Sequence, residues 1–303
     1  MAHIKVVARF FFELSKLAVQ TRKLPDNRLF VRAVYRSCLR REPDSSGESF
    51  YLQALQQRRM RKVDVLRAML ESNEFKKMYN LPVSPLNALH QARMMLVQKH
   101  LPKARFILDL GGTADDHPEG ALLVMGYPYK PAEIIIVDPV LPKSLREYGR
   151  NPEWMTPEGV LIRYYQGSMT DLSWIPDESM DLVFSGESIE HISEAEAQIV
   201  CMQVYRILRP GGYFCLDTPN AALTRLQSPE NLIHPEHKKE YLIHEIREML
   251  GRNNFLIAEE IGICPMPVSL SQRSFDTREL VQNVGLSKNP EEAYLFFVKA
   301  VKP

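Results

Sequence analysis

The sequence predicts an α/β protein in which a doubly wound sheet of seven strands follows a separate N-terminal all-α domain. Two observations lead to this prediction. From Arg105 onward, short apolar runs alternate with helical segments, an order typical of a largely parallel sheet covered by helices. Before Pro85, apolar residues recur at helical spacing instead. We therefore expect an amphipathic leader helix over residues 1–25, a helical domain over 26–82 and the sheet domain over 86–303.

The charge of the chain is divided unevenly along its length. The 303 residues carry 38 Lys and Arg against 37 Asp and Glu, a formal net charge of +1. Residues 1–103 hold 20 basic and 8 acidic side chains, a net +12, and residues 104–303 hold 18 and 29, a net −11. The basic front third favours an anionic partner. Hydrophobic content of 45% and charged content of 25% are ordinary for a globular protein, which excludes a disordered or collagen-like chain.

The start of the chain is apolar in part, but Lys5, Arg9, Glu13 and Lys16 interrupt it. It lacks the uncharged core of a signal peptide and the roughly 20 apolar residues of a membrane span. A helix that packs on its own protein and a helix that lies on a membrane surface both fit this pattern. The four cysteines are widely spaced, which fits a reducing compartment. We expect a cytoplasmic protein, with peripheral attachment to the inner face of the plasma membrane left open.

Apolar positions at helical spacing predict three helices, which run from about Leu29 to Leu39, from Phe50 to Leu55 and from Val63 to Leu70. Here the stretch FVRAVYRSCLRREPDSSGESFYLQAL and the later ESNEF resemble a bacterial helical domain of unknown function related to the phycobilisome linker repeat. Members of that family are appended to surface-polysaccharide and secreted proteins. The resemblance implies a similar setting for this chain.

Seven apolar runs of the second domain predict its strands. They are Phe106–Leu110, Ile134–Val137, Val160–Tyr165, Leu182–Ser185, Tyr213–Asp217, Leu256–Ile263 and Ala293–Val301, the last two an antiparallel pair. The best-defined helix follows Ser193, which has the spacing of a capping box with Glu196, and it ends before Pro210-Gly211-Gly212.

Two of these strands end in residues suited to a ligand. Phe106–Leu110 leads into Gly111 and Gly112, and glycine lets a ligand approach the backbone closely. Ile134–Val137 leads into Asp138, and a carboxylate at that place can accept both hydroxyls of a ribose. Each feature alone also fits an ordinary turn or a solvated loop. The G-x-G-x-x-G fingerprint of a nicotinamide dehydrogenase is absent.

Further motifs follow in a fixed order, namely Gln166–Asp171, Pro176–Phe184, Glu190-His191-Ile192 and Tyr205–Phe214. In this order the set resembles the class I S-adenosylmethionine-dependent methyltransferases, especially the small-molecule branch of the ubiquinone and menaquinone enzymes, over about residues 100–260. The resemblance implies a Rossmann-like methyltransferase domain with S-adenosyl-L-methionine as cofactor. It implies that Asp109, Gly111 and Gly112 hold the amino acid end of the cofactor, that Asp138 binds the ribose diol, that Ser168 and Met169 flank the adenine, and that Ser185 and Gly186 line the floor beneath the sulfonium.

The glycine loop departs from the family's run Asp-Leu-Gly-x-Gly-x-Gly. Thr113 and Asp115 stand at the second and third glycines, and Thr113 is counted among the expected cofactor-binding residues. A side chain at either position would narrow the pocket. The loop has either diverged locally while still binding a cationic sulfonium, or it belongs to a weakened or lost cofactor site.

Three histidines are candidates for the chemistry at the acceptor. Transfer of a methyl group to a hydroxyl requires alignment of the two groups and removal of a proton. His191 follows the fourth strand, where family members place residues facing the acceptor, and histidine is readily poised as a base near neutral pH. His234 and His237 lie in a stretch that folds over the acceptor site in related enzymes. Helix capping for His191 and a solvated loop for the other two are the alternatives. We expect no metal, because the spacing of His234, His237 and Glu187 fits no tight ligand set.

The leading hypothesis is an O-methyltransferase for a sugar or glycan intermediate in bacterial surface-polysaccharide biosynthesis. The sugar acceptor is inferred from the kinds of protein to which the helical domain is usually appended and from the loop from His234 to His237. A methyltransferase for a quinone or other lipid-like molecule, and a non-catalytic scaffold on a degenerate fold, are the alternatives. The expected partners are a small-molecule or glycan acceptor and an anionic membrane surface or lipid-linked carrier. Basic charges spread along helices, and no Asn/Asp-Pro-Pro-aromatic run follows the fourth strand, which argues against nucleic acid.

Overall fold

The computed structural model describes residues 26–57, 59–72, 74–75, 84–114, 117–142, 145 and 152–303. Its chain divides into two compact units, residues 1–84 and 85–303, and each is described by itself. The leader helix predicted over residues 1–25 lies outside the described residues. Within the described ranges, no helix combines the length and the apolar character that crossing a membrane requires.

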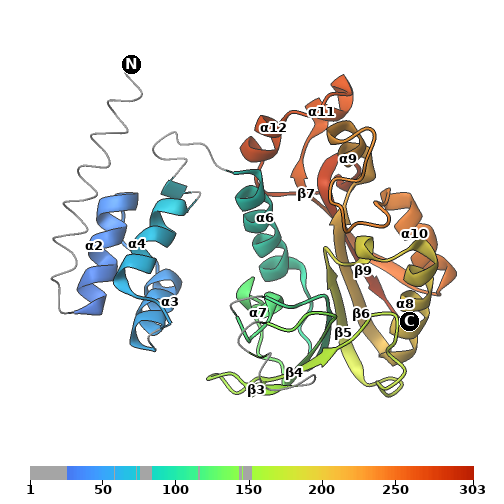
Figure 1. Ribbon diagram of the computed structural model, residues 1–303, viewed down its shortest axis with the longest axis horizontal. Helices are drawn as coiled ribbons and strands as arrows, with labels where there is room; N and C mark the ends of the chain where they lie inside the picture. The colour runs from blue at the N-terminus through green and yellow to red at the C-terminus, as the bar shows by residue number, and fades with distance from the viewer. Residues whose placement is uncertain are drawn as a thin grey trace. The chain divides into compact units, whose positions relative to one another are not determined.

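The first unit is built from helices α2 (Asn27–Leu39), α3 (Ser45–Gln56) and α4 (Lys62–Glu71), which stand where the apolar spacing predicts them (Figure 1). Asp26 caps α2, because its Oδ1 accepts the N–H groups of Arg28 and Leu29. Asp44 caps α3 through the N–H of Gly47. The helices bury a shared apolar core, which consists of Phe30, Val31, Val34, Tyr35, Cys38, Leu39, Val65, Leu66, Met69 and Phe75.

Gly47 in α3 leaves room for Tyr35 of α2. A Cβ atom at position 47 would lie 2.3 Å from the hydroxyl oxygen of Tyr35. We expect Gly47→Val to destabilise the first unit by about 1–3 kcal/mol, because an overpacked contact forces the neighbours to shift. Hydrogen exchange of the α2 and α3 amides in the full chain, read by mass spectrometry, measures this loss. Adding Tyr35→Phe should restore most of the protection, and a double variant no better protected than Gly47→Val would contradict this assignment.

The second unit contains one mixed sheet with the strand order β3-β4-β2-β1-β5-β6-β9-β7-β8. The strands are β1 (Phe106–Leu110), β2 (Glu133–Asp138), β3 (Glu153–Met155), β4 (Leu161–Gln166), β5 (Met180–Gly186), β6 (Leu208–Pro219), β7 (Leu256–Pro265), β8 (Leu286–Ser287) and β9 (Ala293–Val301). The neighbours β4, β2, β1, β5 and β6 are parallel, and β9 is antiparallel to both β6 and β7.

The sheet has nine strands, so the predicted number of seven is wrong. All seven predicted runs form strands, and β7 and β9 make the expected antiparallel pair. The two missed strands are β3, which has three residues and pairs only with β4, and β8, which has two residues and pairs only with β7. Such short edge strands carry too few residues for a readable alternation of apolar and polar positions.

Helices cover both faces of this sheet (Figure 1). One face carries α8 (Glu194–Ile207) and α10 (Ile243–Arg252), whose apolar residues join those of β1, β6 and β9 in one core, and the other carries α6 (Pro85–His100). The capping box predicted for Ser193 and Glu196 is present at the start of α8. This unit also contains the helices α7 (Ala121–Val124), η2 (Ile189–His191), α9 (Ala221–Gln227), α11 (Pro267–Gln272), α12 (Thr277–Gln282) and η3 (Pro290–Glu292).

The strand order places a topological switch point between β1 and β5. From β1 the chain proceeds to β2 and β4 on one side, and it then crosses to β5 and β6 on the other side. In open α/β sheets, ligands bind beyond the carboxyl ends of the strands at such a point. The loops after β1 and β5 are therefore the place to look for a site.

Candidate functional site

A cavity of about 660 Å³ lies at the switch point, within the size range of small-molecule and cofactor sites. It is lined by Gly111, Asp138, Pro139, Val140, Gln166, Gly167, Ser168, Met169, Glu187, Ser188, His191, Ile192 and Glu236. Of the predicted cofactor residues, Gly111, Asp138, Ser168 and Met169 thus line one cavity, together with His191. The other predicted cofactor residues, Asp109, Gly112, Thr113, Ser185 and Gly186, lie outside its lining.

The glycine turn after β1 needs glycine at two successive positions. Gly111 has φ +76°, and a Cβ there would lie 2.7 Å from the Cβ of Ser188, so the loops after β1 and β5 approach closely. A Cβ on Gly112 would lie 2.1 Å from Oδ2 of Asp109. Gly111 therefore opens the cavity, whereas Gly112 accommodates the Asp109 carboxyl.

Asp138 joins the loops that follow β1 and β2. Its Oδ1 accepts the N–H of Val140 at 2.8 Å, and its Oδ2 accepts the N–H of Thr113 at 3.3 Å. The hydroxyl of Thr113 donates to the carbonyl of Val140 at 2.9 Å. Burial raises the pKa of Asp138 above its usual value. The threonine that replaces a family glycine thus ties two loops together, and it is not part of the cavity wall. Asp115 lies outside the described residues.

Asp109 is enclosed behind the cavity, with 1% of its surface exposed. Burial, followed by the nearby charge of Asp138, raises its pKa to about 7, although a hydrogen bond with the backbone of Leu122 opposes the shift. Among the described residues, no donor reaches its Oδ2. Asp109 thus connects the end of β1 to α7 through the backbone of Leu122, while its buried Oδ2 accepts no hydrogen bond from the described residues.

The loop after β5 rests on an arginine that sequence analysis missed. Arg93 of α6 donates through Nε to Oδ2 of Asp217 at 2.6 Å, and its NH1 lies 2.7 Å from Oε2 of Glu187. A Cβ on Gly186 would lie 2.6 Å from the guanidinium NH2 of Arg93, so Gly186 admits this side chain. Glu187 itself has φ +49°, an uncommon conformation that a non-glycine residue adopts when its surroundings enforce it. Ser185 forms a 2.6 Å hydroxyl hydrogen bond with Ser188.

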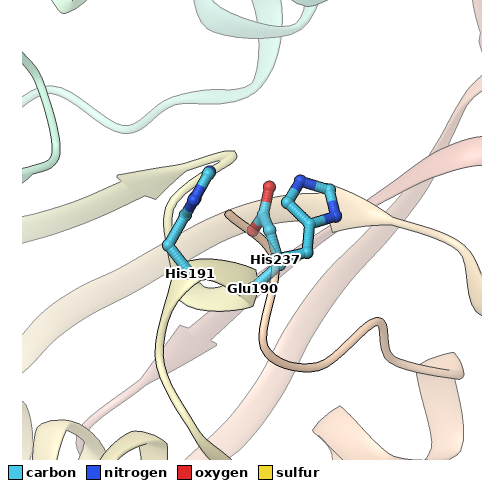
Figure 2. Close-up of side chains that lie close together, drawn as sticks. All are labelled: Glu190, His191 and His237. Atoms are coloured by element: carbon cyan, nitrogen blue, oxygen red, sulfur yellow. The ribbon is translucent and has the colours of Figure 1, made fainter. Parts of the chain in front are cut away.

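The three predicted histidines lie close together, and one of them, His191, lines the cavity. The ring centroids of His191 and His237 lie 5.0 Å apart, and His234 lies 6.1 Å from His191 and 5.4 Å from His237. The backbone carbonyl of Glu190 accepts the N–H groups of Lys238 and Lys239, which holds the histidine loop against η2. The polar ends of Glu190, His191 and His237 project to the same side of the backbone (Figure 2).

Two buried carboxyls accompany these histidines. Nδ1 of His237 lies 2.9 Å from Oε1 of Glu240, which also accepts the N–H of Ile233 at 2.8 Å. Glu190 is 1% exposed, and burial, followed by the charge of Glu187, raises its pKa well above the usual value. Burial and the neighbouring His237 lower the pKa of His191, which favours its neutral imidazole. The cluster thus brings two imidazole rings, those of His191 and His237, close to the buried carboxyl of Glu190.

A second hollow, of about 710 Å³, lies at the amino ends of β1 and β2. Its wall includes Lys103, Arg105, Lys130 and Arg209. Ligands of open α/β sheets bind at the carboxyl ends, so we place the functional site in the 660 Å³ cavity.

Comparison with known proteins agrees with this fold. Residues 129–216 match the model of a methyltransferase domain family, and residues 12–79 match a domain of unknown function, DUF4214. A probable S-adenosylmethionine-dependent methyltransferase of Mycolicibacterium smegmatis is 33% identical over 97 residues, which cover 32% of this chain and 36% of that protein. The chain thus matches about a third of the length of this curated relative.

Two solved structures share the fold of the second unit. A methyltransferase of Thermotoga maritima, described as a possible histamine N-methyltransferase, has a TM-score of 0.51 and 15% identity, over 76% of this chain and 95% of that one. A chain from the complex of the Haloferax volcanii Trm112 methyltransferase activator with a putative methyltransferase has a TM-score of 0.50 and 18% identity, over 71% and 90%. At these identities the likeness concerns the fold alone.

The second unit therefore has the fold of the class I S-adenosylmethionine-dependent methyltransferases, and its residues 129–216 match a methyltransferase domain family. S-adenosylmethionine is the cofactor of this family, and the residues present fit it. Gly111 leaves the cavity open where a Cβ would collide with Ser188, and the carboxyl groups of Asp138, Glu187 and Glu236 line a space that would receive a cationic sulfonium. The predicted class, fold and cofactor are thus confirmed.

Proposed function

We propose that this protein transfers a methyl group from S-adenosylmethionine to a hydroxyl of a sugar or glycan intermediate. The observation that carries the proposal is one cavity whose lining includes Asp138, Ser168, Met169 and His191. A cofactor site and a candidate acceptor site thus share one space. The sugar part is supported by the helical first unit, which resembles domains appended to surface-polysaccharide proteins.

When bound, S-adenosylmethionine supplies an activated methyl group, which passes from its positively charged sulfur to an acceptor oxygen that attacks in line with the C–S bond. Asp138 would accept the ribose hydroxyls, since each carboxylate oxygen that receives a backbone N–H keeps a second lone pair. Ser168 and Met169 would flank the adenine, and Glu187 and Glu236 would favour a cation in the cavity. The cluster of Glu190, His191 and His237 would orient the acceptor and take part in removal of its proton.

Asp138→Ala is expected to weaken binding of S-adenosylhomocysteine, the demethylated product, by about 10–100-fold, because hydrogen bonds to a charged group contribute about 1.5–3 kcal/mol. Isothermal titration calorimetry on the full chain measures this change. Asp177→Ala is the matched control: it removes the same charge from a side chain that is 72% exposed and outside the cavity lining. Equal affinities for Asp138→Ala and the wild type would contradict the ribose role of Asp138.

A scaffold that binds no cofactor is the second candidate. The backbone hydrogen bonds that the Asp138 carboxylate already accepts favour it. Both oxygens already accept backbone N–H groups, so this carboxylate has a structural task of its own. The same calorimetry separates the two candidates, because a scaffold gives no heat with either S-adenosylmethionine or its demethylated product.

We further propose that the acceptor reaches the site at an anionic membrane surface or on a lipid-linked carrier. The net charge of +12 over residues 1–103 supports this setting, since such a region is attracted to anionic surfaces.

A further inference from the structure

Three metal-binding side chains meet beside the cofactor cavity. One ligand atom each from Glu190, His191 and His237 lies within 4.8 Å of the other two (Figure 2). Ligand atoms bound at about 2.1 Å from one ion lie about 3.0–3.4 Å apart in octahedral or tetrahedral geometry. Small side-chain rotations therefore suffice to bring all three onto one ion.

The carboxylate of Glu240 prepares His237 as a ligand. The carboxylate of Glu240 accepts from the N–H of Ile233 and the hydroxyl of Thr224, so Nδ1 of His237 is the donor in the 2.9 Å contact with this carboxylate. The proton on Nδ1 leaves the lone pair on Nε2 free. A carboxylate that fixes the tautomer of a histidine in this way is the usual partner of a metal-bound imidazole.

Glu190 is a buried carboxyl whose charged form a bound cation would stabilise. Its carboxyl is 1% exposed and accepts the hydroxyl of Thr218 at 2.9 Å. Within the described part of the chain, Glu190 forms no ion pair with a lysine or an arginine. A buried carboxylate without a cationic partner is costly, and a bound metal ion removes that cost.

We propose that Glu190, His191 and His237 bind a divalent first-row transition metal ion at the wall of the cavity, and that an oxygen of the methyl acceptor occupies one of its open positions. Two imidazoles and one carboxylate favour such an ion over Mg²⁺ or Ca²⁺, which prefer oxygen ligands alone. Three protein ligands leave positions open, as in catalytic metal sites. Metal binding stands by itself, whereas the role of the acceptor oxygen rests on the proposed function.

The metal would change how the acceptor hydroxyl loses its proton. Coordination lowers the pKa of a bound hydroxyl, so its proton passes to water and the oxygen stays on the ion. This oxygen forms the new O–C bond while the C–S bond of the donor breaks and its electron pair remains on sulfur, which leaves a neutral thioether. In this arrangement the lone pair of His191 binds the ion, and coordination replaces the general-base role predicted for that residue.

Calorimetric titration of the full-length, tag-free and chelator-treated protein with Zn²⁺, with Co²⁺ absorption spectra as a second reading, tests the site. We expect one equivalent to bind, and His191→Gln and His237→Gln to weaken binding by about 100-fold or more. Glu240→Gln should weaken it by about 10–100-fold, since loss of a partner to a metal-bound histidine has effects of this size. His244→Gln is the matched control, because His244 is an exposed histidine on α10 and should bind as the wild type does.

Two results would overturn the metal site: no stoichiometric binding by the wild type, or unchanged affinity in His191→Gln and His237→Gln. Retained binding of S-adenosylhomocysteine shows that each variant is folded. Cofactor binding without metal binding would contradict the metal site and leave the proposed function standing. Metal binding without any cofactor binding would leave the metal site standing and remove the proposed function.

Discussion

Replacing Arg93 with methionine is expected to lower the free energy of unfolding of the second unit by about 3–5 kcal/mol, because it leaves the buried carboxylate of Asp217 without its cation. Arg93 is the partner of both Asp217, whose side chain is 0% exposed, and Glu187. Urea denaturation followed by tryptophan fluorescence measures the loss selectively. The two tryptophans of the chain, Trp154 and Trp174, both belong to residues 85–303.

Arg252→Met provides the comparison for this prediction. Arg252 pairs with Glu248 on α10, but both side chains are more than 60% exposed, and exposed ion pairs contribute only about 0–1 kcal/mol. Removing the buried charge as well, in Arg93→Met with Asp217→Asn, should recover a large part of the loss. A loss below about 1 kcal/mol for Arg93→Met alone would show that water or another group satisfies Asp217.

Arg93 also connects stability with the site. It reaches from α6 to the ends of β5 and β6, and it holds Glu187, which lines the cavity in a left-handed conformation. Such a conformation persists only when surrounding contacts enforce it. We therefore expect Arg93→Met to disturb the cavity wall even under conditions where the fold survives.

The core of the fold could be predicted from the sequence because the central strands are mostly apolar. Ile134–Val137 is buried along its whole length inside β2, and such runs are typical of parallel strands covered on both faces. The edge strands β3 and β8 were not readable, since each pairs on one side only and over two or three residues. Their formation depends on the neighbour that the fold supplies, which no local pattern records.

The site was readable in part for a similar reason. Residues at the carboxyl ends of parallel strands meet at one edge of the sheet, so Gly111 and Asp138 could be placed at one site from the strand pattern, whereas Ser168 was placed there by the resemblance to the methyltransferases. No sequence pattern indicated the role of Arg93, because its partner Asp217 is 124 residues away and on another element. The prediction that no metal binds was based on the spacing of His234 and His237. In the structure the adjacent pair Glu190 and His191 meets His237 instead, because the backbone of Glu190 binds the histidine loop.

The stability of the second unit is expected to fall as the pH rises from about 4 to about 7, because of Asp109. Its pKa is about 7 in the folded protein, against an unfolded value of about 3.9. Between these values the folded state holds a proton that the unfolded state has lost, so raising the pH favours unfolding. At about 1.4 kcal/mol per pKa unit, the effect reaches at most about 4 kcal/mol above pH 7.

Asp109→Asn isolates this contribution, since the amide resembles the protonated carboxyl and cannot ionise. At pH 4 the variant and the wild type should differ little in their urea unfolding, and at pH 8 the variant should be the more stable by up to the full effect. Asp177→Asn, at an exposed carboxylate, should follow the wild type at both pH values. Parallel stability curves for Asp109→Asn and the wild type would mean that Asp109 ionises normally inside the fold. A pH-dependent gap would instead show that the fold keeps a buried carboxylate whose charge destabilises it.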